Sequence, residues 1–278
     1  MRAVGLRCLC GGAAFEKVFE YTAAPQGENR FPQVGRGGYY RQIKRCRVCG
    51  HCLSVHEMDL DGLYGGVYVD SVYGPDGLRK AFERIVALPP AKSDNAGRVA
   101  RVRDFAARYW GGRRAAGSLL DIGSGLAVFT HAMKAHGWRA VALDPDPRAA
   151  AHASRTAGVE AVCARFPDHC IRGQFDLVTF NKVLEHAEDP AAMLAASRRL
   201  VSAQGFLYVE VPDGETAAEQ GSGREEFFIE HHHIFSAASL AILVRSSGFR
   251  LLEMERLREP STKYTLRAFC APPQEVHA

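Results

Sequence analysis

Residues 119–127 read Leu-Leu-Asp-Ile-Gly-Ser-Gly-Leu-Ala, and this stretch decides the fold. A short apolar run ends in Gly-x-Gly and a helical pattern follows, which predicts a strand that turns tightly into a helix. Glycine permits such a turn and lets a ligand approach the backbone without a Cβ in the way. The helix N-terminus behind the turn favours an anionic group such as a carboxylate. We therefore expect a ligand site at the carboxyl end of this strand.

Strand and helix patterns continue to alternate after this turn. Further apolar strands are predicted at 139–144, 159–163, 175–180, 205–211, 249–257 and 263–270, with helices between most of them. Such alternation predicts a mostly parallel sheet covered by helices on both faces. The turn between the last two strands is too short for a crossover helix, so one of them must run antiparallel.

The residues around the glycines also restrict the ligand. Asp144 ends the second strand 19 residues after Gly125, where a carboxylate accepts hydrogen bonds from a ribose diol. A dinucleotide fingerprint would require glycine at position 128, which is Val128. Asp121 suits a ligand with an ammonium group and would repel a pyrophosphate. The alternative interpretation is an ordinary strand–helix turn that uses glycine for geometry alone.

Taken in order, these motifs resemble the class I S-adenosylmethionine-dependent methyltransferases. The resemblance is carried by LLDIGSG (119–125), VALDPD (141–146), FDLVTFNKVLEHAEDP (175–190), GFLYVEVPDGE (205–215) and EHHHIFSAASL (230–240). It implies an α/β, Rossmann-like sheet of seven strands with an antiparallel last strand, and S-adenosylmethionine as cofactor. The cofactor-binding residues it implies are Asp121, Gly123, Ser124, Gly125, Asp144 and Asn181. Many members contact adenine with an acid after the third strand; residues 163–166 offer none, which leaves backbone or Asp168 for that contact.

The histidine run after Glu230 is the predicted catalytic segment. Related methyltransferases of deoxysugars and polysaccharides have a similar Glu-His followed by Phe-Ser, which looks like part of the acceptor pocket. A base beside an oxygen or carbon acceptor contributes typically ~10²–10⁴-fold. We predict His231 as that base and His233 as the second choice, since an extended segment places both on one side. For His186 a cap or a backbone contact is favoured, and a metal site at His231 and His233 is the lesser alternative.

Five of the eight cysteines lie in the first 52 residues. Clustered cysteines in a cytoplasmic chain favour a metal over disulfides. Cys46-x-x-Cys49 followed by glycine has the form of a zinc knuckle, and Cys8 and Cys10 are the predicted partner pair, one residue shorter than the Cys-x-x-Cys of related methyltransferases. His51 and Cys52 are possible substitute ligands, and reduced free thiols are the alternative.

Charge and composition divide the chain into three predicted segments. Residues 1–58 form a zinc-ribbon-like module, 59–115 a Tyr-bearing helical connector or lid, and 116–278 the methyltransferase domain. The net charge of +4 comes from the module, which holds nine Lys and Arg against four Asp and Glu. Its basic and aromatic residues, at 29–56, suit RNA, a nucleotide-linked sugar or simply solvent. Tyr64, Tyr68 and Tyr73 are predicted to line the pocket.

The predicted function is methyl transfer from S-adenosylmethionine to an oxygen or carbon of a sugar, nucleotide-sugar or polysaccharide precursor. The alternatives are an RNA methyltransferase, a small-molecule O-methyltransferase and an inactive cofactor-binding protein. The slightly acidic catalytic segment argues against nucleic acid. No stretch approaches about 18 consecutive apolar residues and the first residues lack an apolar signal, so we expect a soluble cytoplasmic protein. The oligomeric state stays open.

Overall fold

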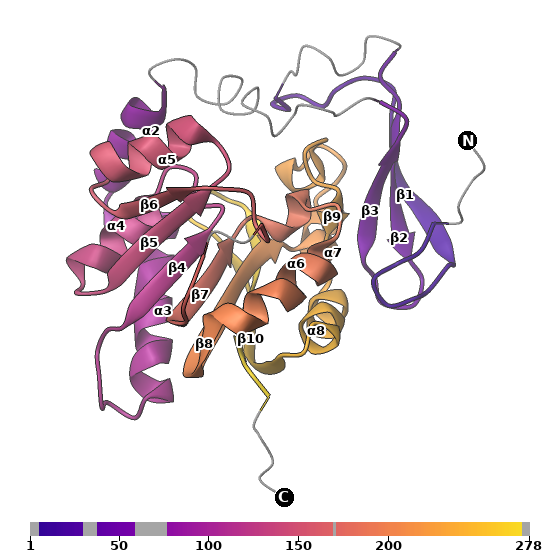
Figure 1. Ribbon diagram of the computed structural model, residues 1–278. Helices are drawn as coiled ribbons and strands as arrows, with labels where there is room; N and C mark the ends of the chain where they lie inside the picture. Colours follow the sequence, from indigo (N-terminus) through magenta and orange to yellow (C-terminus); the bar gives the residue numbers. More distant parts are fainter. Residues whose placement is uncertain (1–5, 30–37, 59–76, 169–170, 274–278) are drawn as a thin grey trace, which may run out of the picture.

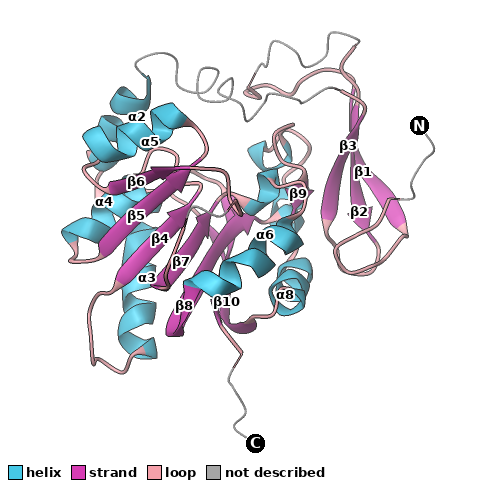
Figure 2. Cartoon of the chain, viewed as in Figure 1, coloured by secondary structure: helices cyan, strands magenta, loops and turns pink. Residues whose placement is uncertain are grey.

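The computed structural model describes residues 6–29, 38–58, 77–168 and 171–273, which are organised around two sheets (Figures 1 and 2). The strands are β1 (Phe15–Tyr21), β2 (Arg41–Cys46), β3 (Cys52–His56), β4 (Ser118–Ile122), β5 (Arg139–Asp144), β6 (Glu160–Cys163), β7 (Phe175–Asn181), β8 (Val201–Pro212), β9 (His233–Ile234), β10 (Arg250–Arg258) and β11 (Tyr264–Ala271). The helices are α2 (Gly77–Val86), α3 (Asp94–Tyr109), α4 (Val128–Ala135), α5 (Pro147–Arg155), α6 (Pro190–Ser197), α7 (Gly214–Glu219) and α8 (Ala237–Ser246).

The larger sheet has seven strands in the order β10-β11-β8-β7-β4-β5-β6. Strands β8, β7, β4, β5 and β6 are parallel to one another, whereas β11 is antiparallel to both β8 and β10. The predicted mostly parallel sheet with an antiparallel last strand is therefore confirmed. Because β4 lies inside the sheet between β7 and β5, the glycine turn that follows it opens at the middle of the carboxyl edge.

Helices cover both faces of this sheet. Successive strand residues face opposite sides, so Leu119 packs toward α3 and α4, while Leu120 packs toward α6 and α8. Helix α3 begins at an N-cap serine, Ser93, whose hydroxyl accepts from the Ala96 amide at 3.1 Å. Helix α6 ends at Ser197, where the chain turns through a 3-10 segment into β8.

The smaller sheet joins the N-terminal segment to the segment around residue 233. Its order is β1-β2-β3-β9, so three strands come from the N-terminal segment and the fourth comes from the predicted catalytic segment. Cys52 pairs with Ile234 and Leu53 with His233, antiparallel. A small apolar core seals the join; it contains Tyr21, Ile43, Cys52, Ala217, Phe227 and Ile234. The N-terminal strands thus fold directly against the elements that carry the histidine run (Figure 1).

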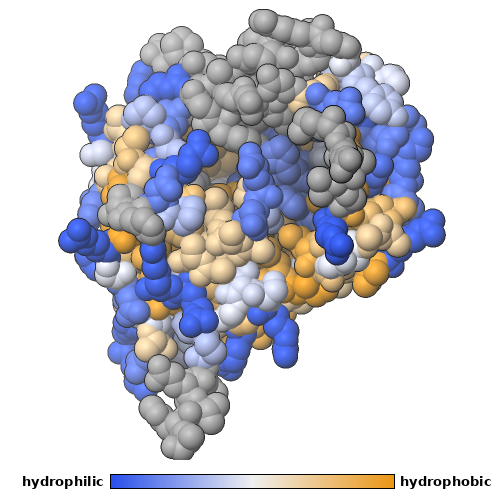
Figure 3. Space-filling model, turned by 45° about the vertical axis from the view of Figure 1, so that its right-hand side comes forward, coloured by the Kyte–Doolittle hydropathy of each residue, from blue (hydrophilic) through white to orange (hydrophobic). Residues whose placement is uncertain are grey.

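Helix α2 packs on the opposite end of the sheet from this join. The Phe82 ring lies 5.2 Å from the ring of His131 on α4 and 5.3 Å from that of His152 on α5. The three tyrosines predicted to line the pocket, at 64, 68 and 73, lie outside the described residues. None of the helices described by the structure is long and apolar enough to cross a membrane. Hydrophilic side chains surround a less polar area on the face shown in Figure 3.

Candidate active site

The backbone after β4 makes the turn that the sequence predicts. Gly123 and Gly125 have φ angles of 72° and 49°, and Ala127 follows with 54°. Side chains adopt this left-handed region reluctantly, so glycine is the natural residue at these positions and Ala127 is an accepted exception. A Cβ at Gly123 would also lie 2.6 Å from Val183 Cγ2. With glycine at these positions, no Cβ stands between a ligand and the backbone of the turn, whereas a residue with a side chain would block that approach.

Asp144 stands beside this turn at the end of β5. Its Oδ2 accepts from the Gly125 amide at 2.8 Å and its Oδ1 from the Asp146 amide at 2.9 Å. Burial raises the pKa of the Asp144 carboxyl, although these two backbone contacts oppose the rise. Each carboxylate oxygen has a second lone pair, so the group can still accept from a diol while it is held in place.

A second polar group forms at the ends of β4 and β7. Asp121 Oδ1 accepts from Thr179 Oγ1 at 2.6 Å and from Asn181 Nδ2 at 2.7 Å. Burial raises the Asp121 pKa to about 6, which these hydrogen bonds oppose. Asn181 Oδ1 and Ser124 Oγ are buried without a hydrogen-bond partner among the described residues. Buried polar atoms in that condition indicate a ligand that is polar at the same place.

A family model described as "Methyltransferase domain" matches residues 93–254, more than half of the chain. The chain belongs to this methyltransferase family. The enzyme is therefore an S-adenosylmethionine-dependent methyltransferase, and the six residues that the sequence predicts to bind the cofactor lie at its glycine turn or at the strand ends beside it.

Two curated relatives share part of this domain. The ubiquinone biosynthesis O-methyltransferase of Azotobacter vinelandii is 32% identical over 108 residues, which cover 34% of this chain and 44% of the relative. That of Thiobacillus denitrificans is 31% identical over 97 residues, which cover 32% of this chain and 42% of the relative. The match therefore spans less than half the length of these relatives.

Two solved structures share the fold. The 1,6-didemethyltoxoflavin-N1-methyltransferase of Burkholderia thailandensis, solved with S-adenosylhomocysteine, has a TM-score of 0.54 and 19% identity over 84% of this chain and 96% of its own. The magnesium protoporphyrin IX methyltransferase of Synechocystis, also with S-adenosylhomocysteine, has a TM-score of 0.57 and 13% identity over 77% of this chain and 100% of its own. At these identities the likeness shows the fold alone.

In the methyltransferase, His231 lies next to His186, which follows β7 at the carboxyl edge of the larger sheet. Their ring centroids lie 5.0 Å apart. His231 Nδ1 lies 2.9 Å from the Glu226 carbonyl and His186 Nδ1 lies 2.8 Å from the Glu230 carbonyl. A carbonyl only accepts, so both rings carry their proton on Nδ1. Burial lowers the pKa of both imidazoles, that of His231 well below its ordinary value, so each ring is neutral and its Nε2 is an acceptor.

His233 does not share this environment. The backbone bends at His232 and enters β9 at His233, so the alternation expected of an extended segment does not hold. His233 Nδ1 instead lies 2.9 Å from His51 Nε2. His51 Nδ1 in turn lies 3.1 Å from Ser239 Oγ. His233 therefore faces the N-terminal strands and not His231.

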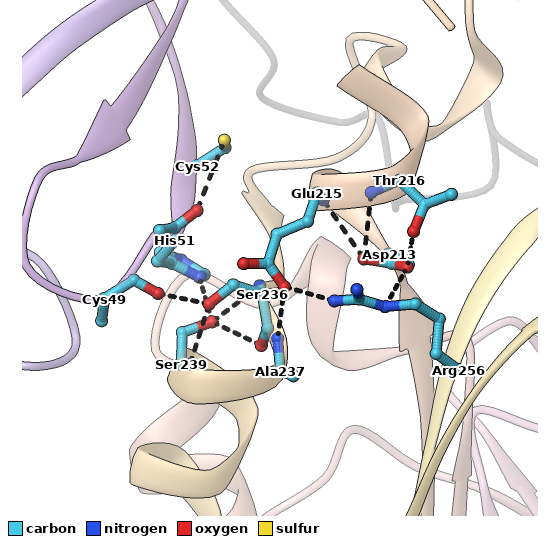
Figure 4. A network of polar contacts seen from close by, with 11 residues as sticks. Cys49, His51, Cys52, Asp213, Glu215, Thr216, Ser236, Ala237, Ser239 and Arg256 are labelled. Carbon is cyan, nitrogen blue, oxygen red and sulfur yellow. Dashed lines mark hydrogen bonds and ion pairs between the residues drawn. The ribbon is translucent and has the colours of Figure 1, made fainter. Parts of the chain in front are cut away.

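We call the contact between the N-terminal strands, β9 and the start of α8 the joint. Further polar contacts reinforce it around the start of α8 (Figure 4). Ser236 Oγ donates to the Cys49 carbonyl and accepts from the Ser239 amide at 2.9 Å. Arg256 Nε pairs with Asp213 Oδ2 at 2.8 Å on the neighbouring β10–α7 side. His51 is therefore held by the joint, and Cys52 donates to the Gly50 carbonyl at 3.7 Å, so neither substitute ligand joins the cysteine cluster.

The four predicted metal ligands do lie together. The sulfur atoms of Cys8, Cys10, Cys46 and Cys49 all fall within 4.8 Å of one another. Cys8 Sγ is 3.4 Å from Cys49 Sγ and Cys10 Sγ is 3.6 Å from Cys46 Sγ, and all four are free thiols. Burial raises the pKa of Cys49 to about 11, whereas amide contacts lower that of Cys46 to about 7. Four sulfurs at tetrahedral spacing fit a zinc ion.

An ion pair that the sequence does not reveal connects the N-terminal strands to the histidine loop. Arg41 Nη2 donates to Glu28 Oε1 at 2.9 Å, and the two side chains are 0% and 1% exposed. Glu28 Oε1 also accepts from the Ile229 amide at 2.7 Å, and Arg41 donates to the Phe227 carbonyl. Both ends of the segment just before His231 are therefore held by one buried pair.

Proposed function

We propose that the enzyme methylates an oxygen or carbon of a sugar, nucleotide-linked sugar or polysaccharide precursor. The observation that carries this proposal is His231, a neutral imidazole whose Nδ1–H donates to the Glu226 carbonyl, which leaves Nε2 as an acceptor. The Glu-His and Phe-Ser residues around it are those that resemble sugar and polysaccharide methyltransferases. A small-molecule hydroxyl acceptor is the second candidate, which the similarity to two ubiquinone biosynthesis O-methyltransferases favours.

The residues around the glycine turn fit S-adenosylmethionine, which supplies an electrophilic methyl group when bound. Asp144 would hold the ribose, and the backbone at Gly123 and Gly125 would receive the methionine moiety. Asp121 would take the ammonium group. The unpartnered Ser124 hydroxyl and Asn181 carbonyl would then gain partners. Because these groups are prearranged, the protein's main task is alignment of the acceptor and exclusion of water.

His231 would act as the general base. Its Nε2 takes the proton of the acceptor hydroxyl while the Glu226 carbonyl holds the opposite edge of the ring. His233 is engaged by His51, so we assign it to the joint and not to proton transfer. Nucleic acid is disfavoured as an acceptor because two basic residues of the module are already engaged: Arg41 is buried against Glu28, and Arg45 pairs with Glu16 at 2.5 Å.

A methyl-transfer assay tests this function. The enzyme is incubated with labelled S-adenosylmethionine and a cell extract, which is then separated into nucleic acid, glycan, nucleotide-sugar and aromatic pools. We expect label in the glycan or nucleotide-sugar pool. His231→Ala should keep S-adenosylhomocysteine affinity and lower turnover by ~10²–10⁴-fold. The matched control is His136→Ala, an exposed histidine at the end of α4; near-normal turnover in His231→Ala would remove the base assignment.

We also propose a structural zinc ion at the four clustered cysteines. The cluster holds four sulfurs that can ionise together only beside a cation. Amides support two of them, since the Gly12 and Val48 amides each donate at 3.4 Å, to Cys10 Sγ and Cys46 Sγ respectively. The test is elemental analysis of freshly purified protein, in which we expect one zinc ion per chain. Protein without zinc would contradict the proposal.

A further inference from the structure

Glu185 is a buried carboxylate with no explained role. It lies in the 3-10 turn Leu184–His186 that follows β7, is 1% exposed, and neither of its oxygens has a hydrogen-bond partner among the described residues. Its backbone carbonyl accepts from the His232 amide at 2.8 Å, which fixes the turn against the histidine loop. Burial raises the Glu185 pKa to about 7. An orphaned buried carboxylate is costly, so its retention indicates a partner that arrives with a ligand.

The carboxylate lies beside the proposed base. One ligand atom each of Glu185, His186 and His231 fall within 4.8 Å of one another. Both rings carry their proton on Nδ1, which donates to a backbone carbonyl, so Nε2 of each neutral ring carries no proton. Neither ring therefore donates a hydrogen bond to the Glu185 carboxyl group. A ligand that donates more than one hydrogen bond, or a cation, would satisfy the Glu185 carboxylate and His231 Nε2 together.

The charges nearby decide between these two kinds of ligand. Lys182 and Lys263 both lower the Glu185 pKa through their positive charge, and both disfavour protonation of His231. Lys182 is held in place because its Nζ donates to Thr265 Oγ1 at 2.8 Å. Because these two ammonium groups act on Glu185 and His231, they oppose the entry of a divalent metal ion there. Hydroxyl groups donate hydrogen bonds without bringing charge, so the site favours them.

We propose that Glu185 binds a hydroxyl of the acceptor adjacent to the one whose proton His231 takes. The acceptor class is then a vicinal diol, on a sugar or on an aromatic ring. Each hydrogen bond spans about 2.7 Å, so two neighbouring hydroxyls can reach the Glu185 carboxylate and His231 Nε2 at once. The inference rests on the proposed function, because it uses the same acceptor position. It makes Glu185 a specificity-determining residue that touches substrate.

Periodate provides a test that works while the acceptor is still unidentified. Periodate cleaves aliphatic vicinal diols and oxidises aromatic ones, so an extract treated with it, quenched and desalted, loses both. We expect the enzyme to label the untreated extract and to lose most of that labelling after treatment. In the untreated extract, label in the nucleotide-sugar or glycan pool identifies a sugar diol. Label in the organic-soluble aromatic pool identifies an aromatic diol.

A variant ties this behaviour to the carboxylate. Glu185→Gln should slow labelling at limiting extract by about 10- to 100-fold, the range of a hydrogen bond to a charged group. Its S-adenosylhomocysteine affinity should stay within about twofold and its melting temperature should stay equal or rise, because a buried carboxylate without a hydrogen-bond partner has been removed. If Glu185 had only a structural role, its replacement would instead lower both the cofactor affinity and the melting temperature. Glu188→Gln, three residues further along and exposed, is the matched control and should label normally.

Each outcome assigns a failure to one proposal. Label that persists after periodate, or normal labelling by Glu185→Gln, overturns the diol inference and leaves the methyltransferase function in place. A second metal equivalent per chain that Glu185→Gln removes also overturns it, in favour of a metal centre. Absence of label from every pool, with S-adenosylhomocysteine still bound, overturns the proposed function and this inference with it.

Discussion

Replacement of Glu28 by glutamine should uncouple the N-terminal strands from the catalytic loop. Glu28 accepts from Arg41 at 2.9 Å, from the Ile229 amide at 2.7 Å and from Tyr39 Oη at 2.6 Å. Glutamine keeps the shape but loses the charge, which leaves the fully buried Arg41 guanidinium uncompensated. Loss of one partner of a buried ion pair costs about 3–5 kcal/mol. At about 2–4 °C per kcal/mol, the melting temperature should fall by roughly 10 °C.

The assay combines thermal unfolding, S-adenosylhomocysteine binding and methyl transfer. Cofactor affinity should change little in Glu28→Gln, since the cofactor residues lie on the larger sheet, while turnover should fall because the loop before His231 is no longer fixed. Glu16→Gln is the control: its pair with Arg45 is 37% and 43% exposed and contributes about 0–1 kcal/mol at most. The double change of Glu28 and Arg41 to methionine should recover stability, because it removes both charges. A Glu28→Gln protein that melts and turns over like Glu16→Gln would refute the reasoning.

Three further outcomes are expected. Gly123→Ala should abolish cofactor binding, because the added Cβ meets Val183 at 2.6 Å. The control is Gly158→Ala, which has φ 68° and nothing within 4 Å of the added Cβ, and it should show only backbone strain of about 1–2 kcal/mol. Equal losses of cofactor affinity in the two variants, measured by calorimetry, would contradict this. Removal of zinc from the four module cysteines should lower the melting temperature and turnover together while cofactor binding on the larger sheet persists, and an unchanged melting curve after chelation would count against the metal. Burial lowers the His233 pKa to about 4 from about 6.5, so its contribution to stability is complete above pH 6.5 and is lost as the pH falls toward 4; the melting temperature should decline over that window, less so in His233→Gln.

Most of the larger sheet is predictable from local patterns. The glycines after 119–122, the acid at the end of the second strand and the short turn before the last strand each follow from backbone geometry within a few residues. The helix caps at Ser93 and Asp189 also follow from the sequence, since a cap needs only its own helix. These features depend on neighbours in the chain, which is why the pattern suffices.

The acceptor side is less predictable because it depends on contacts between distant segments. Nothing local marks Glu28 or Arg41 as buried, since the partner of each is the other, 13 residues away. The place of His186 beside His231 is hidden in the sequence because 45 residues separate the two. An extended run would put His233 on the side of His231, whereas β9 begins only at His233. Glu185 does carry a local signal: a glutamate directly before a histidine, just past a strand end on the cofactor edge.

The two-residue strand β9 has a practical consequence for engineering. Because residues 233–234 complete a sheet whose other strands come from 15–56, the N-terminal part is no interchangeable cassette. A chimaera that exchanges only the first 58 residues would place a foreign strand edge against β9 and would separate Arg41 from the loop it holds. A chimaera designed to change the acceptor preference should therefore exchange the N-terminal strands and residues 226–240 together and keep the cofactor-binding part of the original chain.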